Sequence, residues 1–536
     1  MNARRGRLVL AMLAAFLSSV AGRASAAREY PLLSGPGDQS VLGLYRNIVL
    51  LADDPSQGGA FDLLYYDLYT QRLQPVPVLT GARVVDASVW EDLVVWTDGK
   101  DYRDEGYYAD TDIYATRLAT GDVFAVCEHP AEQFNASVGD RLIVWSDERN
   151  QVGQWSNTDV YYLDLTSGES GPVTTAAGDQ GSMFVPQSAG RIVVWDDTTI
   201  DGNATDLYGC DLDTQEEFPI EVGAGRSTDG PSIWGDHVAF DYLPEEGSRR
   251  VYVFDLVSRT LSPLSAEGSA GLHASMCASI VVWTDFRNYG STWTDIYAYD
   301  LAQAEEFPVC TATRFQDLPR VYGDLVIWSD DRNYEDGVSG LDVYACDLER
   351  NPFWDVRTDE WSFSAVSAAS QADVARGYED RSYRPKQCVT RAQMAAYISR
   401  AMLGGDANVP PPSGDQVYPD IPRDHWAYRY IQYASAQSVV TGYDDGSYHP
   451  DDVVDRAQMA VFVGRARGWV VLGDDMAVAP ELFPDVPAGH WAGTAIEACV
   501  EHGVVQGYDD GLYRPDAVVT RDQMAVYIAR AFELPM

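Results

Sequence analysis

Three copies of one segment, in phase to the residue, make up the C-terminal third of this chain. They open with Phe353, Tyr418 and Phe483, which lie 65 residues apart. Each copy then runs through a tryptophan, a Gly-Tyr pair and a Thr/Asp-Arg-x-Gln block at matching positions. A period this strict indicates one supersecondary unit used three times, which needs its neighbours to bury its apolar face.

Each copy predicts two helices joined by a polar turn. In the third copy, Trp491, Ala495 and Cys499 repeat at i, i+4 and i+8, as on one face of a helix. Gly503 then stands where a helix ends, and a second helix begins at Thr520. The pattern therefore predicts an all-α unit of three repeats, with the boundaries 351–416, 417–481 and 482–536.

The Thr390-Arg391-Ala392-Gln393 block recurs around Arg456 and Arg521. Its first and last residues predict a capping box, in which the N-cap side chain accepts from a free backbone N–H and the Gln side chain reaches back. An arginine at the first helical position faces the positive end of the helix dipole, which is unfavourable unless an anion lies there. Because all three copies keep this arginine, we predict an anion-binding groove in each repeat rather than capping alone.

The repeats resemble the S-layer homology (SLH) motif over residues 353–536, with Gln in place of the Glu of its Thr-Arg-Ala-Glu block. The resemblance implies a pseudo-threefold bundle whose grooves bind secondary cell-wall polysaccharide, often with pyruvate ketals whose carboxylate meets the motif arginine. The glycan-binding residues that it implies are Arg391, Arg456, Arg521, Asp355, Asp420, Asp485, Trp361, Trp426 and Trp491. For the tryptophans, packing in the core is an open alternative.

The repeats depart from the motif at several positions. Asp455 replaces Thr in the second copy, and its carboxylate would weaken the binding of an anion. In the first copy Glu360 replaces the His that precedes the other two tryptophans, and Arg381 replaces a turn glycine. The groove of the first copy therefore departs most from the family pattern.

A second, looser repeat runs over residues 40–350, within a predicted propeller domain of residues 27–350. Its head is a β-branched strand that ends in an aromatic and an acidic residue, as in Val94-Val95-Trp96-Thr97-Asp98, and its tail is an Asp-x-Tyr strand. Seven copies follow one another, with 43 to 50 residues between heads. Small sheets of this kind bury both faces only when they stack radially, so we predict an all-β seven-bladed β-propeller, with six or eight blades as the alternatives. The pattern resembles TolB-type or WD40-like propeller repeats.

The last copy lacks the final strand that most copies have, such as Glu306-Phe307-Pro308-Val309. A similar segment, Glu29-Tyr30-Pro31-Leu32, lies at the other end of the chain. We therefore predict that an N-terminal strand, 29–33, completes the last blade. Such closure removes the open sheet edges that invite aggregation.

The first 26 residues predict a cleaved secretory signal peptide, with arginines near the start, an apolar run from Leu8 to Val20 and an Ala24-Ser25-Ala26 cleavage site. The apolar run is shorter than the roughly 20 residues of a membrane-spanning helix. No later segment is apolar enough to span, so we expect an exported protein without a transmembrane segment. The formal net charge of −43 argues against a nucleic-acid partner. The seven cysteines show no CxxC spacing, which argues against a zinc site. Several stand at strand positions where a neighbouring copy has Tyr or Val, which favours buried free thiols over a disulfide framework.

Asp-Arg-Asn runs follow the head strand in three copies, at Arg149, Arg287 and Arg332. We interpret them as Asp–Arg pairs with an Asx turn. Ca²⁺ in these acidic loops is the alternative, although no spacing matches an EF-hand, and no cofactor is predicted. The chain has no G-x-S-x-G, HExxH or P-loop motif.

Together these patterns predict a non-enzymatic cell-surface protein, fixed noncovalently to cell-wall polysaccharide by SLH repeats. The propeller would bind a protein or glycan ligand, or contribute to a surface layer. One alternative is a wall-tethered glycan hydrolase or lyase with its site in the central mouth of the propeller, and another is a spacer without a ligand. Blade-specific acidic and aromatic residues at that mouth would favour the enzyme, and a uniform mouth would favour a scaffold.

Overall fold

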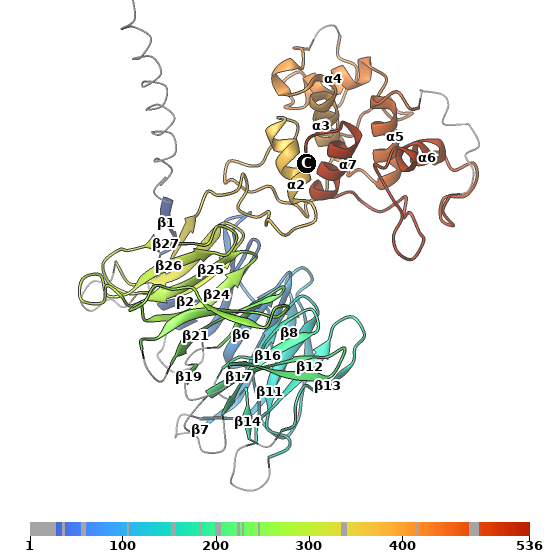
Figure 1. The fold of residues 1–536 in the computed structure, drawn as a ribbon. Coiled ribbons are helices and arrows are strands. Elements are labelled where there is room, and N and C mark those ends of the chain that lie inside the picture. The colour runs from blue at the N-terminus through green and yellow to red at the C-terminus, as the bar shows by residue number, and fades with distance from the viewer. Residues whose placement is uncertain are drawn as a thin grey trace, which may run out of the picture. The chain divides into compact units, whose positions relative to one another are not determined.

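A computed structural model describes residues 28–536, except for 35–37, 55–60, 104–106, 152–156, 177, 182–183, 199–204, 222–225, 228–229, 245–246, 334–339, 413–414 and 471–481. The predicted signal peptide, residues 1–26, lies outside the described residues. The chain divides into two compact units, Met1–Glu349 and Arg350–Met536. The first is built of strands and the second of helices (Figure 1).

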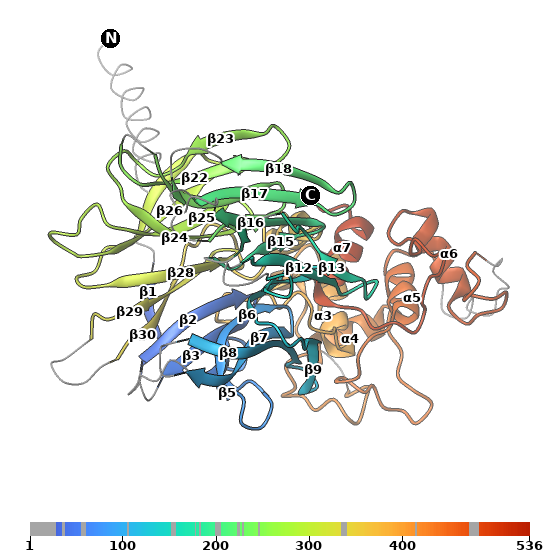
Figure 2. The same cartoon turned by 90° about the horizontal axis from the view of Figure 1, so that it is seen from below.

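The first unit is a seven-bladed β-propeller, which confirms the predicted fold (Figure 2). Each blade is an antiparallel sheet of consecutive strands. The strands of blades one to three are β2 (Asp38–Tyr45), β3 (Ile48–Asp54), β4 (Asp62–Asp67) and β5 (Arg72–Pro75); β6 (Val84–Trp90), β7 (Leu93–Arg103), β8 (Tyr107–Arg117) and β9 (Asp122–Cys127); β10 (Gln133–Val138), β11 (Leu142–Asp147), β12 (Asp159–Asp164) and β13 (Ser170–Pro172).

Blades four and five each split their innermost strand in two, and blade seven takes its outer strand from the start of the chain. The strands of blades four to seven are β14 (Asp179–Gln180), β15 (Gln187–Ala189), β16 (Ile192–Thr198), β17 (Thr205–Asp211) and β18 (Glu216–Glu221); β19 (Arg226–Ser227), β20 (Ser232–Trp234), β21 (His237–Leu243), β22 (Arg250–Asp255) and β23 (Thr260–Pro263); β24 (Gly271–Cys277), β25 (Ile280–Asp285), β26 (Asp295–Asp300) and β27 (Glu305–Cys310); β28 (Gln316–Tyr322), β29 (Leu325–Asp330), β30 (Asp342–Asp347) and β1 (Arg28–Leu33).

The β-branched head strands form the cores between blades. Each lies second in its sheet, so both of its faces are covered by neighbouring blades. Trp96, Trp195, Trp283 and Trp328 are at most 1% exposed. Between blades two and three, for example, Val95 packs in one cluster with Trp145. Burial on both faces explains why these strands are apolar without alternation.

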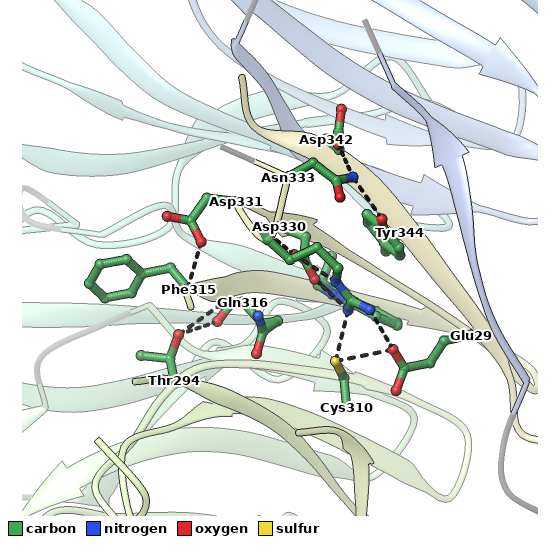
Figure 3. A network of polar contacts seen from close by, with 12 residues as sticks. Glu29, Thr294, Cys310, Phe315, Gln316, Asp330, Asp331, Asn333, Asp342 and Tyr344 are labelled. Carbon is green, nitrogen blue, oxygen red and sulfur yellow. Dashed lines mark hydrogen bonds and ion pairs between the residues drawn. The ribbon is translucent and has the colours of Figure 1, made fainter. Parts of the chain in front are cut away.

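Strand β1 closes the ring by pairing antiparallel with β30, with Glu29 opposite Cys346. Arg332 Nη1 donates to Glu29 Oε2 at 3.0 Å, and Arg332 also forms a two-pronged pair with Asp330 (Figure 3). Arg287 pairs in the same way with Glu306 in blade six, at 2.5 Å. Glu29 therefore takes in the last blade the place that Glu306 has in a blade of continuous chain.

The second unit contains six α-helices and one short 3₁₀ helix among its described residues. They are α2 (Phe363–Gln371), α3 (Arg391–Leu403), η1 (Asp406–Asn408), α4 (Tyr428–Ala436), α5 (Arg456–Ala466), α6 (Gly493–Glu501) and α7 (Arg521–Ala531). The second helix of each repeat packs on the first helix of the next: α3 on α4, α5 on α6, and α7 back on α2. In the described part of the chain, no helix has the length and apolar character needed to cross a bilayer.

The three repeats also meet in a closed ring of backbone hydrogen bonds. The N–H of Val389 donates to the carbonyl of Val519, Val519 donates to Val454, and Val454 donates to Val389, each at 2.9 Å. All three valines are buried. The ring places an approximate threefold axis through the segments that precede the second helices, so the repeats form one bundle.

Asp406 ties the first repeat to the second. Its Oδ1 accepts from Arg400 Nε on α3 at 2.9 Å and from Arg429 Nη2 on α4 at 2.6 Å, and the Tyr430 hydroxyl donates to it as well. Burial alone would raise the pKa of this carboxyl, but these three donors outweigh it and hold the pKa well below its usual range. The carboxylate is therefore a charged link between two helices.

Candidate functional site

The capping box is present at the start of α3, as predicted. The Thr390 side chain accepts from the backbone N–H of Gln393, and the Gln393 side chain accepts from the N–H of Thr390, at 3.3 and 3.2 Å. At the start of α5, Asp455 Oδ1 accepts from the N–H of Gln458 at 2.7 Å. The N-cap residues thus satisfy backbone donors that a helix leaves free.

The three block arginines are buried, each only 3–4% exposed, and each reaches into the following repeat. Arg391 Nε donates to the carbonyl of Tyr448 at 2.9 Å. Arg456 and Arg521 donate in the same way to the carbonyls of Tyr513 and Tyr383. The Nη2 atoms donate to three further carbonyls, those of Thr441, Gln506 and Arg376. The arginines therefore clamp neighbouring repeats together, a role that the sequence did not indicate.

The tyrosines that receive these bonds return them. The hydroxyl of Tyr448 donates to the carbonyl of Arg391 at 3.0 Å, and Tyr513 and Tyr383 donate likewise to Arg456 and Arg521. All three tyrosines are fully buried. Burial raises the pKa of each hydroxyl, and the neighbouring guanidinium only partly opposes it. They remain neutral donors at any physiological pH.

The third guanidinium nitrogen, Nη1, has a side-chain hydrogen-bond acceptor in two of the arginines and none in the other. Nη1 of Arg456 donates to the hydroxyl of Tyr527, and Nη1 of Arg521 to that of Tyr397. Phe462 stands at the matching position beside Arg391, 5.6 Å from its guanidinium, and has no hydroxyl to offer. Of the three, the Arg391 guanidinium therefore keeps a nitrogen that no side chain of the described residues accepts from.

The three predicted aspartates organise the polar turn of their own repeat. Asp355 accepts from the backbone N–H groups of Tyr383 and Arg384, both at 2.7 Å. Asp420 and Asp485 make the same pair of bonds in repeats two and three. Because these carboxylates are occupied by backbone donors, the structure gives them a positioning role, and their contact with glycan stays a prediction.

The three tryptophans are exposed: Trp361, Trp426 and Trp491 are 59%, 56% and 50% exposed. The tyrosines of the Gly-Tyr pairs lie over the buried arginines, with Tyr443 4.7 Å from the Arg391 guanidinium and Tyr508 5.0 Å from that of Arg456. In the sequence, this Gly-Tyr pair marks only the period of the repeat. Its exact repetition was the available signal for a ring that covers each arginine.

The glycine of that pair is required by packing. A Cβ at Gly442 would lie 2.5 Å from the carbonyl oxygen of Ser447 and 2.6 Å from the ring of Tyr418. Gly377 and Gly507 face the same obstruction from Phe353 and Phe483. The Gly-Tyr pair therefore lets the turn approach the aromatic residue that opens each repeat.

The Asp-Arg-Asn runs of the propeller are structural, as interpreted from the sequence. Asp330 accepts from the backbone N–H of Arg332 at 2.9 Å, which is the Asx turn, and from two of its guanidinium nitrogens. Asn333 Nδ2 donates to Asp342 and to the hydroxyl of Tyr344 (Figure 3). Their acidic oxygens are thus occupied by protein donors.

Comparison with known proteins bears on the helical unit. The model of the S-layer homology domain matches residues 352–395, 417–460 and 482–525. The chain carries three S-layer homology domains. These matches coincide with the three repeats predicted from the sequence and with helices α2 to α7.

The similar curated proteins share only part of this chain. "Cell surface glycoprotein 1" of Acetivibrio thermocellus is 34% identical over 164 residues, which is 30% of this chain and 7% of that protein. "Cellulosome-anchoring protein" of the same species is 32% identical over 165 residues, 30% of this chain and 36% of that protein. "Endoglucanase" of Bacillus sp. (strain KSM-635) is 29% identical over 181 residues, 33% of this chain and 18% of that protein. The chain thus spans about a third or less of these relatives.

Solved structures resemble the propeller distantly. A manganese complex of oligogalacturonate lyase has 13% identity and a TM-score of 0.43, covering 61% of this chain and 95% of that one. TolB from Acinetobacter baumannii has 14% identity and a TM-score of 0.36, covering 60% of this chain and 73% of that one. Likenesses this distant carry no conclusion about activity.

Proposed function

We propose that the three S-layer homology domains anchor this exported chain noncovalently to cell-wall polysaccharide and that the propeller is displayed at the cell surface. The names of the similar proteins, which include a cell surface glycoprotein and a cellulosome-anchoring protein, support this localisation. The observation that carries the proposal is the closed three-repeat bundle with one tryptophan per repeat left exposed. A soluble bundle has no structural need for three exposed indoles at equivalent positions.

The chemistry of the grooves fits a glycan with anionic groups. Exposed tryptophan rings offer flat faces to the apolar side of a pyranose. Beside Arg391, the guanidinium nitrogen without a side-chain acceptor offers a charge-assisted hydrogen bond to a carboxylate such as that of a pyruvate ketal. We therefore assign the anion contact to the Arg391 groove first, although its repeat departs most from the family motif.

The test is sedimentation of the mature chain, residues 27–536, with isolated wall sacculi before and after chemical removal of pyruvate. A Trp361→Ala/Trp426→Ala/Trp491→Ala variant should lose most of its binding. The matched control is Tyr289→Ala, which removes a 54% exposed aromatic side chain from the propeller. Binding that survives loss of all three tryptophans would refute the glycan contact.

A second arm separates the anion contact from the anchor itself. Arg391→Gln should reproduce the effect of pyruvate removal, and sacculi without pyruvate should bind wild type and variant equally. If Arg391→Gln weakens binding to both kinds of sacculi alike, the arginine acts only by holding the repeats together.

An enzyme is the second candidate, and one observation favours it. The mouth of the propeller carries blade-specific side chains rather than a uniform ring: Asp86 on β6 and His273 on β24 line it, and Asp317 on β28 bonds to His273. A wall-tethered glycan hydrolase or lyase would release new reducing ends from wall polysaccharide, and Asp86→Asn would abolish that release. The absence of any new reducing ends would leave the non-enzymatic function standing.

A further inference from the structure

A cavity of about 460 Å³ lies where the innermost strands of all seven blades converge. Aromatic rings gather at the ends of four of these strands: Tyr45 lies 4.6 Å from Trp90 and 5.1 Å from Tyr322, and Trp90 lies 5.5 Å from Trp234. Trp90 and Trp234 belong to blades two and five, which are not neighbours, so their rings meet across the axis. Tyr45, Trp90 and Trp234 line the cavity and form an aromatic floor, the name kept below for these three residues, while the buried Tyr322 packs against Tyr45.

Asp86 lines this cavity with a negative charge that has no cationic partner. Its carboxylate accepts from the hydroxyl of Thr97 at 2.7 Å and from the backbone N–H of Asn135 at 3.2 Å. Both donors are neutral, and no ion pair to Asp86 occurs among the residues that the structure describes. The backbone of Ala136 also contributes a hydrogen bond, and such neutral bonds only partly offset the removal of a carboxylate from bulk water.

Arg320 lines the same cavity with a positive charge that has no carboxylate within ion-pair distance in the described part of the chain. Its Nε donates to the carbonyl of Leu42 at 3.1 Å and its Nη1 to that of Pro319 at 3.0 Å. The remaining acid nearby, Asp317, is already held by His273 Nδ1 at 2.7 Å and by the hydroxyl of Thr284 at 2.8 Å. Asp317 acts electrostatically on Arg320 without forming an ion pair with it, so Arg320 and Asp86 are two charges of opposite sign that no ion pair neutralises.

The two charged side chains line one cavity from strands of different blades. Arg320 comes from β28 and Asp86 from β6, and β2 packs between these strands. Because Arg320 bonds to Leu42 on β2, its guanidinium is turned toward the side from which Asp86 comes. Ser188 also lines the cavity, and its hydroxyl is buried without a hydrogen-bond partner. The cavity thus holds a donor cation, an acceptor anion and an unsatisfied hydroxyl.

We propose that this cavity binds a small zwitterion, an amino acid or the end of a short peptide, with its carboxylate on Arg320 and its ammonium on Asp86. Each unpaired charge then gains the charge-assisted partner that the protein does not supply. The aromatic floor receives the apolar side chain of the ligand. The volume of the cavity limits the ligand to a single residue or a dipeptide.

The test is calorimetric titration of the mature chain with L- and D-alanine, phenylalanine and alanyl-alanine. Two capped probes divide the site: N-acetyl-alanine removes the ammonium, and alaninamide removes the carboxylate. Each cap should weaken binding at least about tenfold, since each removes one charge-assisted bond. Equal binding of N-acetyl-alanine and free alanine would show a simple anion site and overturn the proposal, as would tighter binding of a neutral monosaccharide.

Variants of the protein should mirror the probes. Arg320→Gln should abolish discrimination against alaninamide, and Asp86→Asn should abolish discrimination against N-acetyl-alanine. Asn at position 86 keeps one oxygen that accepts from the backbone N–H of Asn135, and its amide N–H can donate to the Thr97 hydroxyl. Circular dichroism checks that this variant keeps its fold. The matched control is Arg72→Gln on the exposed outer strand β5. If the folded protein gives no binding heat with any of the amino acids or the dipeptide, the proposal is overturned.

The pH dependence gives an independent measurement. Burial raises the pKa of Asp86 to about 6, against the opposing effect of its hydrogen bonds from Thr97 and the backbone near Asn135. The other charged groups that line the cavity are His273 and Arg320, and Asp317 lies behind them, bonded to His273 and acting on Arg320. Affinity for alanine should fall as the pH drops through about 6 and Asp86 is neutralised. Alaninamide should show the same fall, whereas the Asp86→Asn variant should show none; a fall in that variant would contradict the assignment.

Discussion

Removing one hydroxyl from the bundle should reveal how much the arginine clamps contribute to stability. Tyr527 and Arg456 are both buried, and the tyrosine hydroxyl accepts from Arg456 Nη1 at 2.5 Å. Tyr527→Phe leaves that guanidinium N–H without an acceptor in a site closed to water. Hydrogen bonds to charged groups contribute about 1.5–3 kcal/mol, so the free energy of unfolding of the helical unit should fall by about this amount.

The chain offers a matched control at the same guanidinium. The ring of Tyr508 lies 5.0 Å from Arg456, but this side chain is 36% exposed and its hydroxyl makes no hydrogen bond to the described residues. Tyr508→Phe keeps the ring over the cation and should cost less than about 0.5 kcal/mol. The comparison therefore isolates the buried hydroxyl from the aromatic contact.

The reverse change is available in the neighbouring clamp. Phe462→Tyr supplies the acceptor that Arg391 lacks, and should raise the free energy of unfolding by about 0.5–1.5 kcal/mol. The same hydroxyl would compete with a glycan anion for Nη1. Wall binding should therefore weaken while stability increases.

The assay is denaturant unfolding of the mature chain, followed by helical circular dichroism for the second unit and by tryptophan fluorescence for the propeller. Only the helical transition should shift in these three variants. If Tyr527→Phe and Tyr508→Phe lower its midpoint equally, the buried hydrogen bond is not the source of the stability and the clamp interpretation is refuted.

Three further changes test other parts of the structure by the same unfolding assay. Gly442→Ala should lower the free energy of unfolding by about 3 kcal/mol or more, because the new Cβ would lie 2.5 Å from the Ser447 carbonyl oxygen. The control Gly446→Ala, at a φ of +83° with open space around it, should lower it by only about 1 kcal/mol. Equal losses would contradict the role of packing at Gly442. The pKa of Asp406 is lowered in the folded state, so this carboxylate adds to the free energy of unfolding above about pH 4, and the addition is lost as the pH falls further. Asp406→Asn should remove this loss of stability in acid. An unchanged dependence of stability on acid pH in that variant would contradict the role of Asp406. Glu29→Gln should cost the propeller about 1 kcal/mol or less, since its ion pair is partly exposed, and a loss confined to the helical unit would be inconsistent with ring closure.

The propeller could be predicted almost entirely from its repeats. A strand covered on both faces must be apolar throughout, and the recurring tryptophan at its end fills the interface between blades. β1 and β27 share a Glu-aromatic-Pro pattern because the glutamate of each strand pairs with the arginine at the same position of its blade. These arginines are Arg332 for β1 and Arg287 for β27. Repetition exposed what a single copy would hide. The cavity was not predictable, because its charges come from positions that differ between blades.

The helical repeats show where local reasoning stops. Four residues were enough to predict the N-cap and the arginine at the first helical position. Because that arginine faces the positive end of the helix dipole, an anion was expected beside it. The structure fills that place with carbonyl oxygens from a turn 57 residues further along, as for Arg391 and Tyr448. A carbonyl oxygen accepts hydrogen bonds from a guanidinium much as an anion does. The sequence of one repeat does not indicate which of the two acceptors is present. The missing hydroxyl at Phe462 distinguishes the hydrogen bonding of the Arg391 guanidinium from that of Arg456 and Arg521.

Both units depend on a contact between their two ends. The propeller closes through β1 and β30, and the bundle closes through α7 and α2 and through the bond from Arg521 to the carbonyl of Tyr383. Deleting residues 482–536 removes the partners of Arg456 and leaves a buried cation with no acceptor, so two repeats should not fold as two thirds of a bundle. A chain of residues 27–481 should lose wall binding and the cooperative helical transition while the propeller transition stays in place. A truncated chain that still binds sacculi would mean that each repeat folds and binds alone, and the clamps would then be contacts between independent modules.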